Sequence, residues 1–181
     1  MAKNKFQLKD LIYISLFAAL MAIGAWISVP GVVPFTLQTF VVFATAGLLG
    51  WKRGTIAVLV YILLGAIGIP VFSGFRGGIG ALTGATGGYI VGFLISVFVT
   101  GLICDKLGHG FIVSFVAMVI GLVLCYAFGT AWFVILYTKT KGAMTVAGAL
   151  SACVVPFIIP DLVKILVATI VVNRLSKHIT L

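Results

Sequence analysis

The sequence predicts an all-α, polytopic membrane protein, and two observations support that fold class. The chain has 181 residues, of which 62% are hydrophobic and 8% are charged, whereas charged residues make up about 25% of a typical soluble domain. Apolar runs that could cross a hydrocarbon core of about 30 Å, which takes roughly 17–25 residues, recur along the whole chain. Lipid is therefore the expected solvent, and we expect a single membrane domain over residues 1–181.

Three apolar segments in the first part of the chain are candidate transmembrane helices. The first, Leu11–Val29, is too long for the hydrophobic region of a signal peptide and has no small-residue cleavage site after it, so we expect a retained helix. The second and third, Phe35–Gly50 and Gly54–Ile69, are short and are separated only by a basic turn at 51–53. So short a turn predicts an antiparallel hairpin.

Three further candidates bring the predicted number of transmembrane helices to six, and they cover Thr86–Cys104, Phe111–Tyr137 and Val146–Val172. The last of these contains two prolines, Pro156 and Pro160. Because proline lacks the backbone N–H of a helix interior, we expect the helix to start or break at Pro160. Such a break would leave free N–H groups close to Asp161.

The distribution of positive charge predicts the orientation of the chain. The formal net charge is +9, but the basic residues lie singly or in small groups between apolar segments, a pattern typical of membrane topology and not of nucleic-acid binding. With the N-terminus inside, eight would face the cytoplasm: Lys3, Lys5, Lys9, Lys52, Arg53, Lys106, Arg174 and Lys177. Three would lie outside: Arg76, Lys139 and Lys141. We therefore expect a multi-pass protein of the cell membrane with both termini in the cytoplasm.

A glycine-rich connection, from Pro70 to Gly88, joins the third and fourth candidate helices and contains seven glycines. Glycine loses more backbone freedom on ordering than any other residue, so a flexible tip is one explanation. Aromatic and aliphatic side chains such as Phe72 and Phe75 interleave with the glycines. This pattern favours the other explanation, a structured lid whose backbone passes close to a ligand.

The residues expected of an enzyme are missing from the sequence. His109 and His178, expected in a turn and in the C-terminal tail, have no Cys or carboxylate at the spacing of metal ligands on the same helix, and the pattern GxxxxGK[ST] for ATP phosphates is absent. The three cysteines are scattered singly, which argues against a disulfide framework and a metal site. We expect no catalytic residues, no metal and no cofactor.

Asp161 and Lys164 stand inside the last apolar segment, in a chain that has only three acidic residues. Counting from Arg174 at about 1.5 Å per residue places the Lys164 ammonium near the middle of the bilayer, where a charge costs about 2.5–3.5 kcal/mol. One explanation is a structural ion pair at i, i+3. The favoured explanation is a ligand site, because ionisable residues within a membrane usually mark substrate or ion pathways.

Four further residues have two explanations each. The amide of Gln38 suits a urea or amide ligand, or a hydrogen bond between helices. Arg76, in the glycine-rich connection, either meets an anion or is a solvated tip. Ala18 and Ala22 are four residues apart on the first helix. Small residues at that spacing allow either packing within the bundle or docking of a separate membrane subunit.

Four separated motifs give the whole chain a resemblance to the BioY family, the biotin-binding S-components of energy-coupling factor (ECF) transporters. They read Pro-Phe-Thr-Leu-Gln-Thr at 34–39, Gly-Ile-Pro-Val-Phe-Ser-Gly-Phe at 68–75, Thr-Gly-Ala-Thr-Gly-Gly-Tyr at 83–89 and Pro-Phe-Ile-Ile-Pro-Asp-Leu-Val-Lys at 156–164. The chain departs from the family pattern at Ala85, where Pro is frequent, and at Pro160, where Gly is common. Both departures concern the backbone.

The resemblance implies that biotin binds from the outer side, in a cavity closed by the first and third connections. Asp161 would accept from the ureido N–H groups, Lys164 would be a ligand contact or the counter-ion of Asp161, and Arg76 would meet the valerate carboxylate. The ligand-binding candidates are Asp161, Lys164, Gln38, Arg76, Thr86 and Tyr89. Ala18 and Ala22 would face the membrane-embedded T-subunit, and two ATPase subunits would supply the energy. The alternatives are a stand-alone secondary transporter or facilitator and a structural membrane protein.

Overall fold

The structure is a computed structural model, and it describes residues 7–31, 33–140 and 142–177. Four residues named above for their charge or side-chain chemistry lie outside the described residues: Lys3, Lys5, Lys141 and His178.

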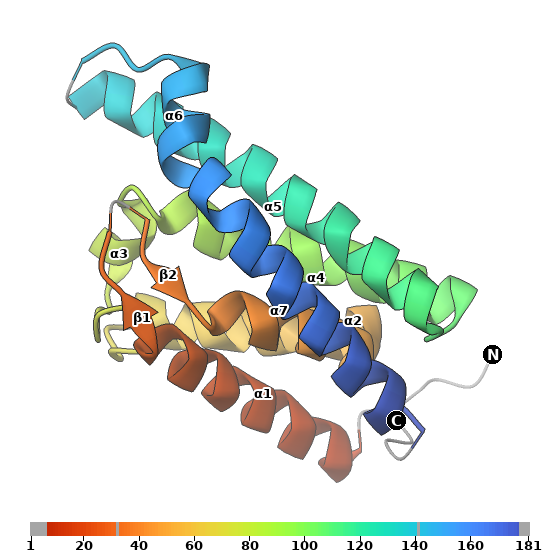
Figure 1. Ribbon diagram of the computed structural model, residues 1–181. Coiled ribbons are helices and arrows are strands. Elements are labelled where there is room, and N and C mark those ends of the chain that lie inside the picture. The colour runs from red at the N-terminus through yellow and green to blue at the C-terminus, as the bar shows by residue number, and fades with distance from the viewer. Residues whose placement is uncertain (1–6, 32, 141, 178–181) are drawn as a thin grey trace.

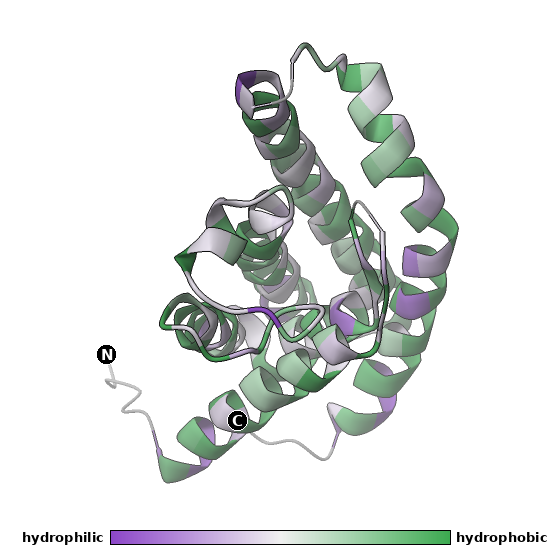
Figure 2. Cartoon of the chain, turned by 90° about the vertical axis from the view of Figure 1, so that its left-hand side faces the viewer, coloured by the Kyte–Doolittle hydropathy of each residue, from purple (hydrophilic) through white to green (hydrophobic). Residues whose placement is uncertain are grey.

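Five helices are long and apolar enough to cross a membrane by length and composition: α1 (Leu8–Trp26), α2 (Gln38–Ala66), α4 (Gly87–Leu107), α5 (Phe111–Thr140) and α7 (Val155–Leu175). They form an elongated bundle (Figure 1), and apolar residues predominate along all of them (Figure 2). Two short helices, α3 (Ile79–Thr83) and α6 (Val146–Cys153), complete the helical part. The expected bounds agree with these to within a few residues for every long helix except the last, α7, which begins nine residues later than expected.

Helix α2 contains the turn that the sequence predicted between its second and third apolar segments. Gly50 departs from helical geometry, with φ 69° and ψ −175°, a backbone conformation open essentially to glycine alone. A Cβ atom built on Gly54 would lie 3.4 Å from the backbone oxygen of Thr45. Residues on either side of Gly50 therefore face each other, and α2 consists of two antiparallel limbs, 38–49 and 51–66 (Figure 1).

The last apolar segment differs from its prediction in two ways. It is interrupted at Val154, where φ −126° and ψ −56° separate α6 from α7. The expected break at Pro160 is wrong, because Pro160 lies inside α7 and the helix begins five residues earlier with Pro156 in its first turn. Proline is tolerated in a first turn, where the N–H has no helical acceptor. Asp161 is therefore one turn deeper in the helix than expected.

One end of the bundle, which we call the capped end, carries most of the non-helical structure. Strands β1 (Ser28–Val29) and β2 (Phe35–Thr36) pair antiparallel there, with Ser28 opposite Thr36. Because of this hairpin, the chain is not purely α-helical as the predicted fold class had it. The segment 67–86, which includes α3, covers the same end (Figure 1).

The glycine-rich segment at the capped end is held at both of its ends by tryptophan. The indole Nε1 of Trp26 donates to the backbone oxygen of Pro70 over 2.8 Å, and that of Trp132 donates to the oxygen of Gly84 over 3.2 Å. Between them, Phe72 pairs with Arg76 through backbone hydrogen bonds. These contacts correspond to the structured lid and not to the flexible tip.

The opposite end, which we call the turn end, uses the other two acidic residues of the chain. Asp10 forms an ion pair of 2.9 Å with Arg53, and Asp105 accepts a hydrogen bond of 3.3 Å from the backbone N–H of Trp51. Both carboxylates hold the turn of α2, one from α1 and one from α4. The third acidic residue, Asp161, does not contact this turn and lies in the interior of the bundle.

Candidate functional site

A cavity lies under the capped end, between the first limb of α2 and helices α4, α5 and α7. The empty space in it, counted together with the open solvent at its entrance, is about 760 Å³. Its lining is mainly apolar and aromatic, with polar groups at a few points. The residues that line it are Val33, Pro34, Thr36, Gln38, Thr39, Phe72, Ser73, Arg76, Ala81, Thr86, Tyr89, Ile90, Phe93, Leu122, Cys125, Tyr126, Cys153, Phe157, Asp161 and Lys164.

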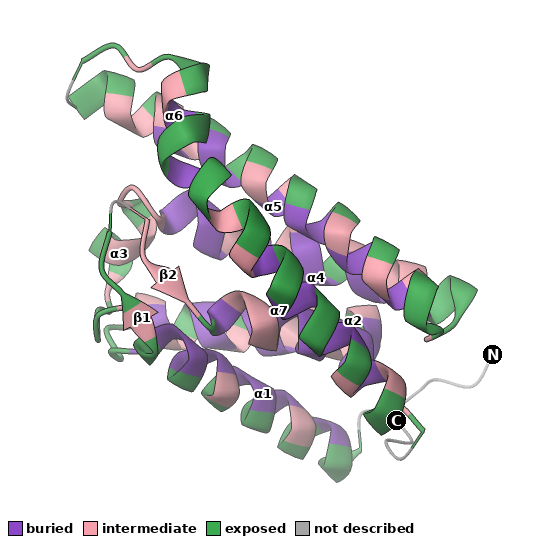
Figure 3. Ribbon diagram, in the orientation of Figure 1, coloured by how far each residue is buried: buried purple, intermediate pink, exposed green. Residues whose placement is uncertain are grey.

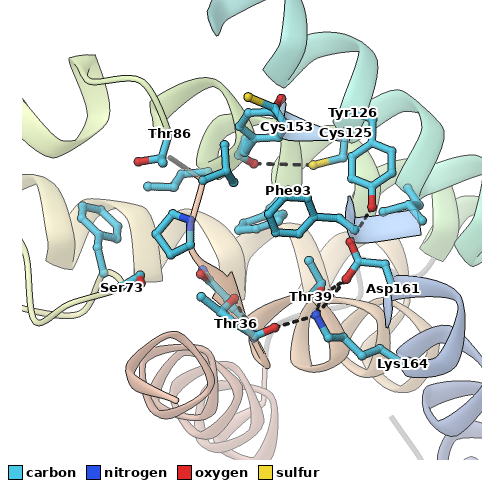
Figure 4. A pocket seen from close by; sticks show the side chains of 18 of the residues that line it. Thr36, Thr39, Ser73, Thr86, Phe93, Cys125, Tyr126, Cys153, Asp161 and Lys164 are labelled. Carbon is cyan, nitrogen blue, oxygen red and sulfur yellow. Dashed lines mark hydrogen bonds and ion pairs between the residues drawn. The ribbon is translucent and has the colours of Figure 1, made fainter. Parts of the chain in front are cut away.

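Asp161 is the centre of the polar part of this lining, and only 2% of it is exposed. Its Oδ1 accepts from Thr39 Oγ1 over 2.9 Å and from Lys164 Nζ over 2.8 Å. Its Oδ2 accepts from Tyr126 Oη over 2.6 Å (Figure 4). A carboxylate offers about four lone-pair positions, two on each oxygen. Two donors use those of Oδ1 and one donor uses one of Oδ2, so one lone pair of Oδ2 is free to accept from an N–H group.

Lys164 lies on the next turn of α7 and neutralises Asp161. Its ammonium also donates to the backbone oxygen of Thr36 over 2.6 Å and to Thr39 Oγ1 over 3.1 Å (Figure 4). The ring of Phe35 covers it, with Nζ 4.1 Å from the ring centroid. An ammonium has three N–H donors, and three acceptors surround this one. The ion pair that was one of the two explanations for these residues is therefore present, and both of its residues line the cavity.

Gln38 opens the first limb of α2 and is 4% exposed. Its side chain lines the cavity, and its Nε2 has no hydrogen-bond partner among the described residues. Leaving a buried donor unpaired costs about 1–3 kcal/mol. The Gln38 side chain also interacts with the Tyr61 hydroxyl on the second limb of α2, so Gln38 meets a neighbouring helical limb as well as the cavity.

Three other expected site residues lie around the cavity with different roles. Tyr89 is buried, and its hydroxyl shares a hydrogen bond of 3.1 Å with Thr130 Oγ1. Thr86 is the residue before α4 and lines the cavity. Arg76 is exposed at the mouth, where its Nε donates to the backbone oxygen of Ser73 over 3.1 Å. The structure therefore brings all six ligand-binding candidates to one cavity.

The sequence reasoning missed several residues of the site. Tyr126 lies in the middle of α5, inside an apolar run that contains no acidic or basic residue, and its spacing carries no signal of a polar role. Cys125, beside it, donates from Sγ to the backbone oxygen of Tyr89 over 3.6 Å. Thr39 ends the motif at 34–39, and nothing in the sequence marks it as a partner of Asp161 and Lys164. No group of three or more His, Cys, Asp or Glu that could hold a metal ion occurs among the described residues.

Ala18 and Ala22 lie in the hydrophobic core, 3% and 5% exposed. Helices α1 and α2 pack closely, since a Cβ atom added to Gly24 of α1 would lie 3.2 Å from the Cα atom of Gln38 on α2. Small side chains such as those of Ala18 and Ala22 allow such close packing. One face of α1 is exposed along the helix (Figure 3). Ser15 and Ala19 are among its exposed residues. The structure therefore buries the predicted alanine pair inside the bundle, whereas docking of a separate subunit stays a prediction.

Comparisons with known proteins agree on one family. The model of the BioY family matches residues 1–180. The biotin transporter BioY of Thermotoga maritima is 44% identical, over 94% of this chain and 97% of its own length. The probable biotin transporter BioY of Pyrococcus horikoshii is 42% identical, over 94% of this chain and 98% of its own length. A crystal structure of the S-component for biotin from an ECF-type ABC transporter superposes with a TM-score of 0.85 at 26% identity, over 98% of this chain and 95% of that one.

Proposed function

Because the chain belongs to the BioY family, we propose that it is the substrate-binding S-component of an ECF-type importer and that its ligand is biotin. The observation that carries the proposal is that one cavity holds a buried carboxylate with a free acceptor position and a buried amide whose Nε2 has no hydrogen-bond partner among the described residues. Asp161 supplies the acceptor, and Gln38 Nε2 supplies the donor.

The polar groups of biotin complement those of the cavity. Its ureido ring has two N–H donors and one carbonyl acceptor, the thiophane ring is apolar, and the valerate chain ends in a carboxylate. A ureido N–H donates to Asp161 Oδ2, and Gln38 Nε2 donates to the ureido oxygen. Phe93 and Phe157 contribute apolar wall beside the fused rings, and Tyr89 and Thr86 line the side next to α4. Arg76, at the mouth, pairs with the carboxylate. Lys164 is the counter-ion of Asp161.

The topology that serves this function places the capped end outside and both termini in the cytoplasm. Counting the two limbs of α2 separately gives six spans in a single domain over residues 1–181. Positive charge among the described residues supports this orientation, because cytoplasmic ends carry the excess of Lys and Arg. The turn end carries Lys9, Lys52, Arg53, Lys106, Arg174 and Lys177, and the capped end carries Arg76 and Lys139.

Import requires partners in this scheme, namely a membrane-embedded T-subunit and two ATPase subunits. The exposed face of α1, with Ser15 and Ala19, is the surface we assign to the T-subunit, because small residues let a second helix approach closely. Ala19→Trp should reduce recovery of the T-subunit in a pull-down without affecting biotin binding. Biotin uptake in cells that lack the T-subunit and the ATPases would instead favour a stand-alone transporter.

Equilibrium binding tests the proposed function directly. Calorimetry on the purified protein in detergent should show tight binding of biotin, and Asp161→Asn should weaken it at least tenfold. Asp105→Asn is the matched control, because this carboxylate lies at the turn end, and it should bind like the wild type. A wild-type protein that does not bind biotin, or an Asp161→Asn variant with unchanged affinity, would contradict the proposal.

A further inference from the structure

Tyr61, on the second limb of α2, carries a polar group deep in the protein at a place that the proposed function does not use. The side chain is fully buried, and it is not among the residues that line the cavity. Its hydroxyl donates to the backbone oxygen of Val71 over 3.1 Å. A carbonyl oxygen only accepts, so the single hydrogen of the phenol lies on this bond. Toward any second group the hydroxyl oxygen can therefore act only as an acceptor.

The glycine-rich segment holds the Tyr61 ring in place. Phe72 meets the ring edge-on, with ring centroids 5.5 Å apart and an angle of 78° between the planes. The Phe72 ring in turn lies against Gly65, where an added Cβ atom would overlap it. The position of the hydroxyl is thus fixed by close packing as well as by its hydrogen bond to Val71.

The side chain of Gln38 is the second group that this hydroxyl meets, since Gln38 and Tyr61 lie on the two antiparallel limbs of α2. The backbone of Gln38 is held tightly. Its N–H donates to Thr36 Oγ1 over 3.2 Å, and a Cβ atom on Gly24 of α1 would lie 3.2 Å from its Cα atom. What remains to be set at Gln38 is the direction of its side-chain amide.

The two ends of that amide differ, because the N–H2 group donates and the oxygen accepts. With its hydrogen engaged by Val71, the Tyr61 oxygen attracts the N–H2 end of Gln38 and repels the oxygen end. Nε2 nevertheless has no hydrogen-bond partner among the described residues. The interaction with Tyr61 therefore turns the amide in one direction and leaves its donors to a ligand.

We infer that Tyr61 is a positioning residue that fixes the direction of the Gln38 amide, so that the cavity selects a ligand with an acceptor atom at this point over a ligand with a donor there. Tyr61 would then determine specificity from outside the cavity. The identity of the preferred ligand rests on the proposed function, whereas the direction of the amide does not.

The test compares Kd values of biotin and of its cyclic guanidine analogue, which has an N–H group in place of the ureido oxygen, for the wild type and Tyr61→Phe. Without the phenol oxygen, the Gln38 amide can turn its own oxygen toward the analogue. The preference for biotin should therefore fall roughly threefold to tenfold, the size of one neutral hydrogen bond. In the Gln38→Leu background, Tyr61→Phe should leave the preference unchanged.

Trp26→Phe is the matched control, because it removes a hydrogen bond to the oxygen of Pro70, the residue before Val71. It loosens the same segment without touching the Gln38 amide, so it should weaken both ligands by the same factor. A preference that stays at the wild-type value in Tyr61→Phe would overturn the inference. A preference that falls equally in Trp26→Phe would overturn it as well.

NMR of the ligand-free protein gives a second measurement that does not depend on biotin. The chain contains two glutamines, Gln7 and Gln38, so labelling glutamine alone makes their side-chain N–H2 signals visible. Tyr61→Phe should move the signals of Gln38 and leave those of Gln7 in place, whereas Trp26→Phe should leave both in place. Gln38 signals that Tyr61→Phe does not move would contradict the positioning role. Failure of the wild type to bind biotin would contradict the proposed function instead, and the Gln38 signals would still decide the role of Tyr61.

Discussion

Tyr126 and Asp161, which lie on different helices, are joined by a hydrogen bond of 2.6 Å from Oη to Oδ2. The phenol lines the cavity and meets the carboxylate on the side opposite Thr39 and Lys164, which both donate to Oδ1. Donors on both oxygens hold the plane of the carboxylate in one orientation. The direction in which Asp161 presents its remaining lone pair is thus set by three residues from three helices.

Tyr126→Phe should weaken biotin binding about tenfold, because a hydrogen bond to a charged group contributes about 1.5–3 kcal/mol and part of it fixes the acceptor for the ligand. Calorimetric titration with biotin measures the effect. Tyr13→Phe serves as the control, since Tyr13 packs against the core from α1 and does not line the cavity. Equal affinities for the two variants would contradict the positioning role of Tyr126.

Gln38→Glu should reverse the preference between biotin and its cyclic guanidine analogue, in which an N–H group replaces the ureido oxygen. The Nε2 donor of Gln38 matches the oxygen of biotin and opposes the N–H of the analogue, whereas a carboxylate matches only the analogue. Kd values for both ligands with both proteins measure the preference. Gln38→Leu should weaken biotin binding without favouring the analogue. A ratio of affinities that is the same in wild type and Gln38→Glu would show that Gln38 does not meet this atom.

Trp26→Phe and Trp132→Phe should each loosen the segment 67–86, because each removes an indole N–H that donates to its backbone. A neutral hydrogen bond contributes about 0.5–1.5 kcal/mol, so biotin affinity should fall by up to about tenfold in each variant. Faster hydrogen exchange at 70–84 would accompany the loss. Trp51→Phe, at the turn end, is the control and should change neither quantity. Exchange at 70–84 that stays slow in both variants would mean that other contacts hold the segment.

Gly50→Ala should destabilise the protein by at least about 1–3 kcal/mol, since a side chain strains a backbone conformation that only glycine adopts freely. The added Cβ atom would also lie 2.6 Å from Asp105 Oδ1. The melting temperature in detergent measures the loss. Gly110→Ala is the control, because its Cβ atom would meet no atom within 4 Å and its φ is not positive. A Gly50→Ala variant that melts with the control would contradict the turn geometry.

Several features could be predicted from the sequence because they depend on residue type and spacing alone. The apolar runs located the long helices, the 51–53 turn located the reversal in α2, and four motifs identified the family, which the comparisons confirm. Because Asp161 and Lys164 lie deep in an apolar segment, the sequence predicted them as ligand-site residues, and both line the cavity. The break was misplaced at Pro160 instead of Val154, because a proline pattern does not say which of two prolines occupies the first turn.

Other features depend on which faces of distant segments meet, and those only the tertiary structure decided. The spacing of Ala18 and Ala22 on α1 fits packing within the bundle as well as docking of a separate subunit. In the structure α1 packs on α2, and both alanines lie in the core. In the sequence, Tyr126 does not differ from other aromatic residues of an apolar helix. Its polar role follows from the fold, which places it on α5 next to Asp161 of α7. Lys164 has one obvious partner along its own helix, whereas its bond to Thr36 joins residues 128 positions apart. Residue type determined that a charge pair would be buried in this protein, and the fold determined which groups it holds, because hydrogen bonds depend on positions in space that no local spacing encodes.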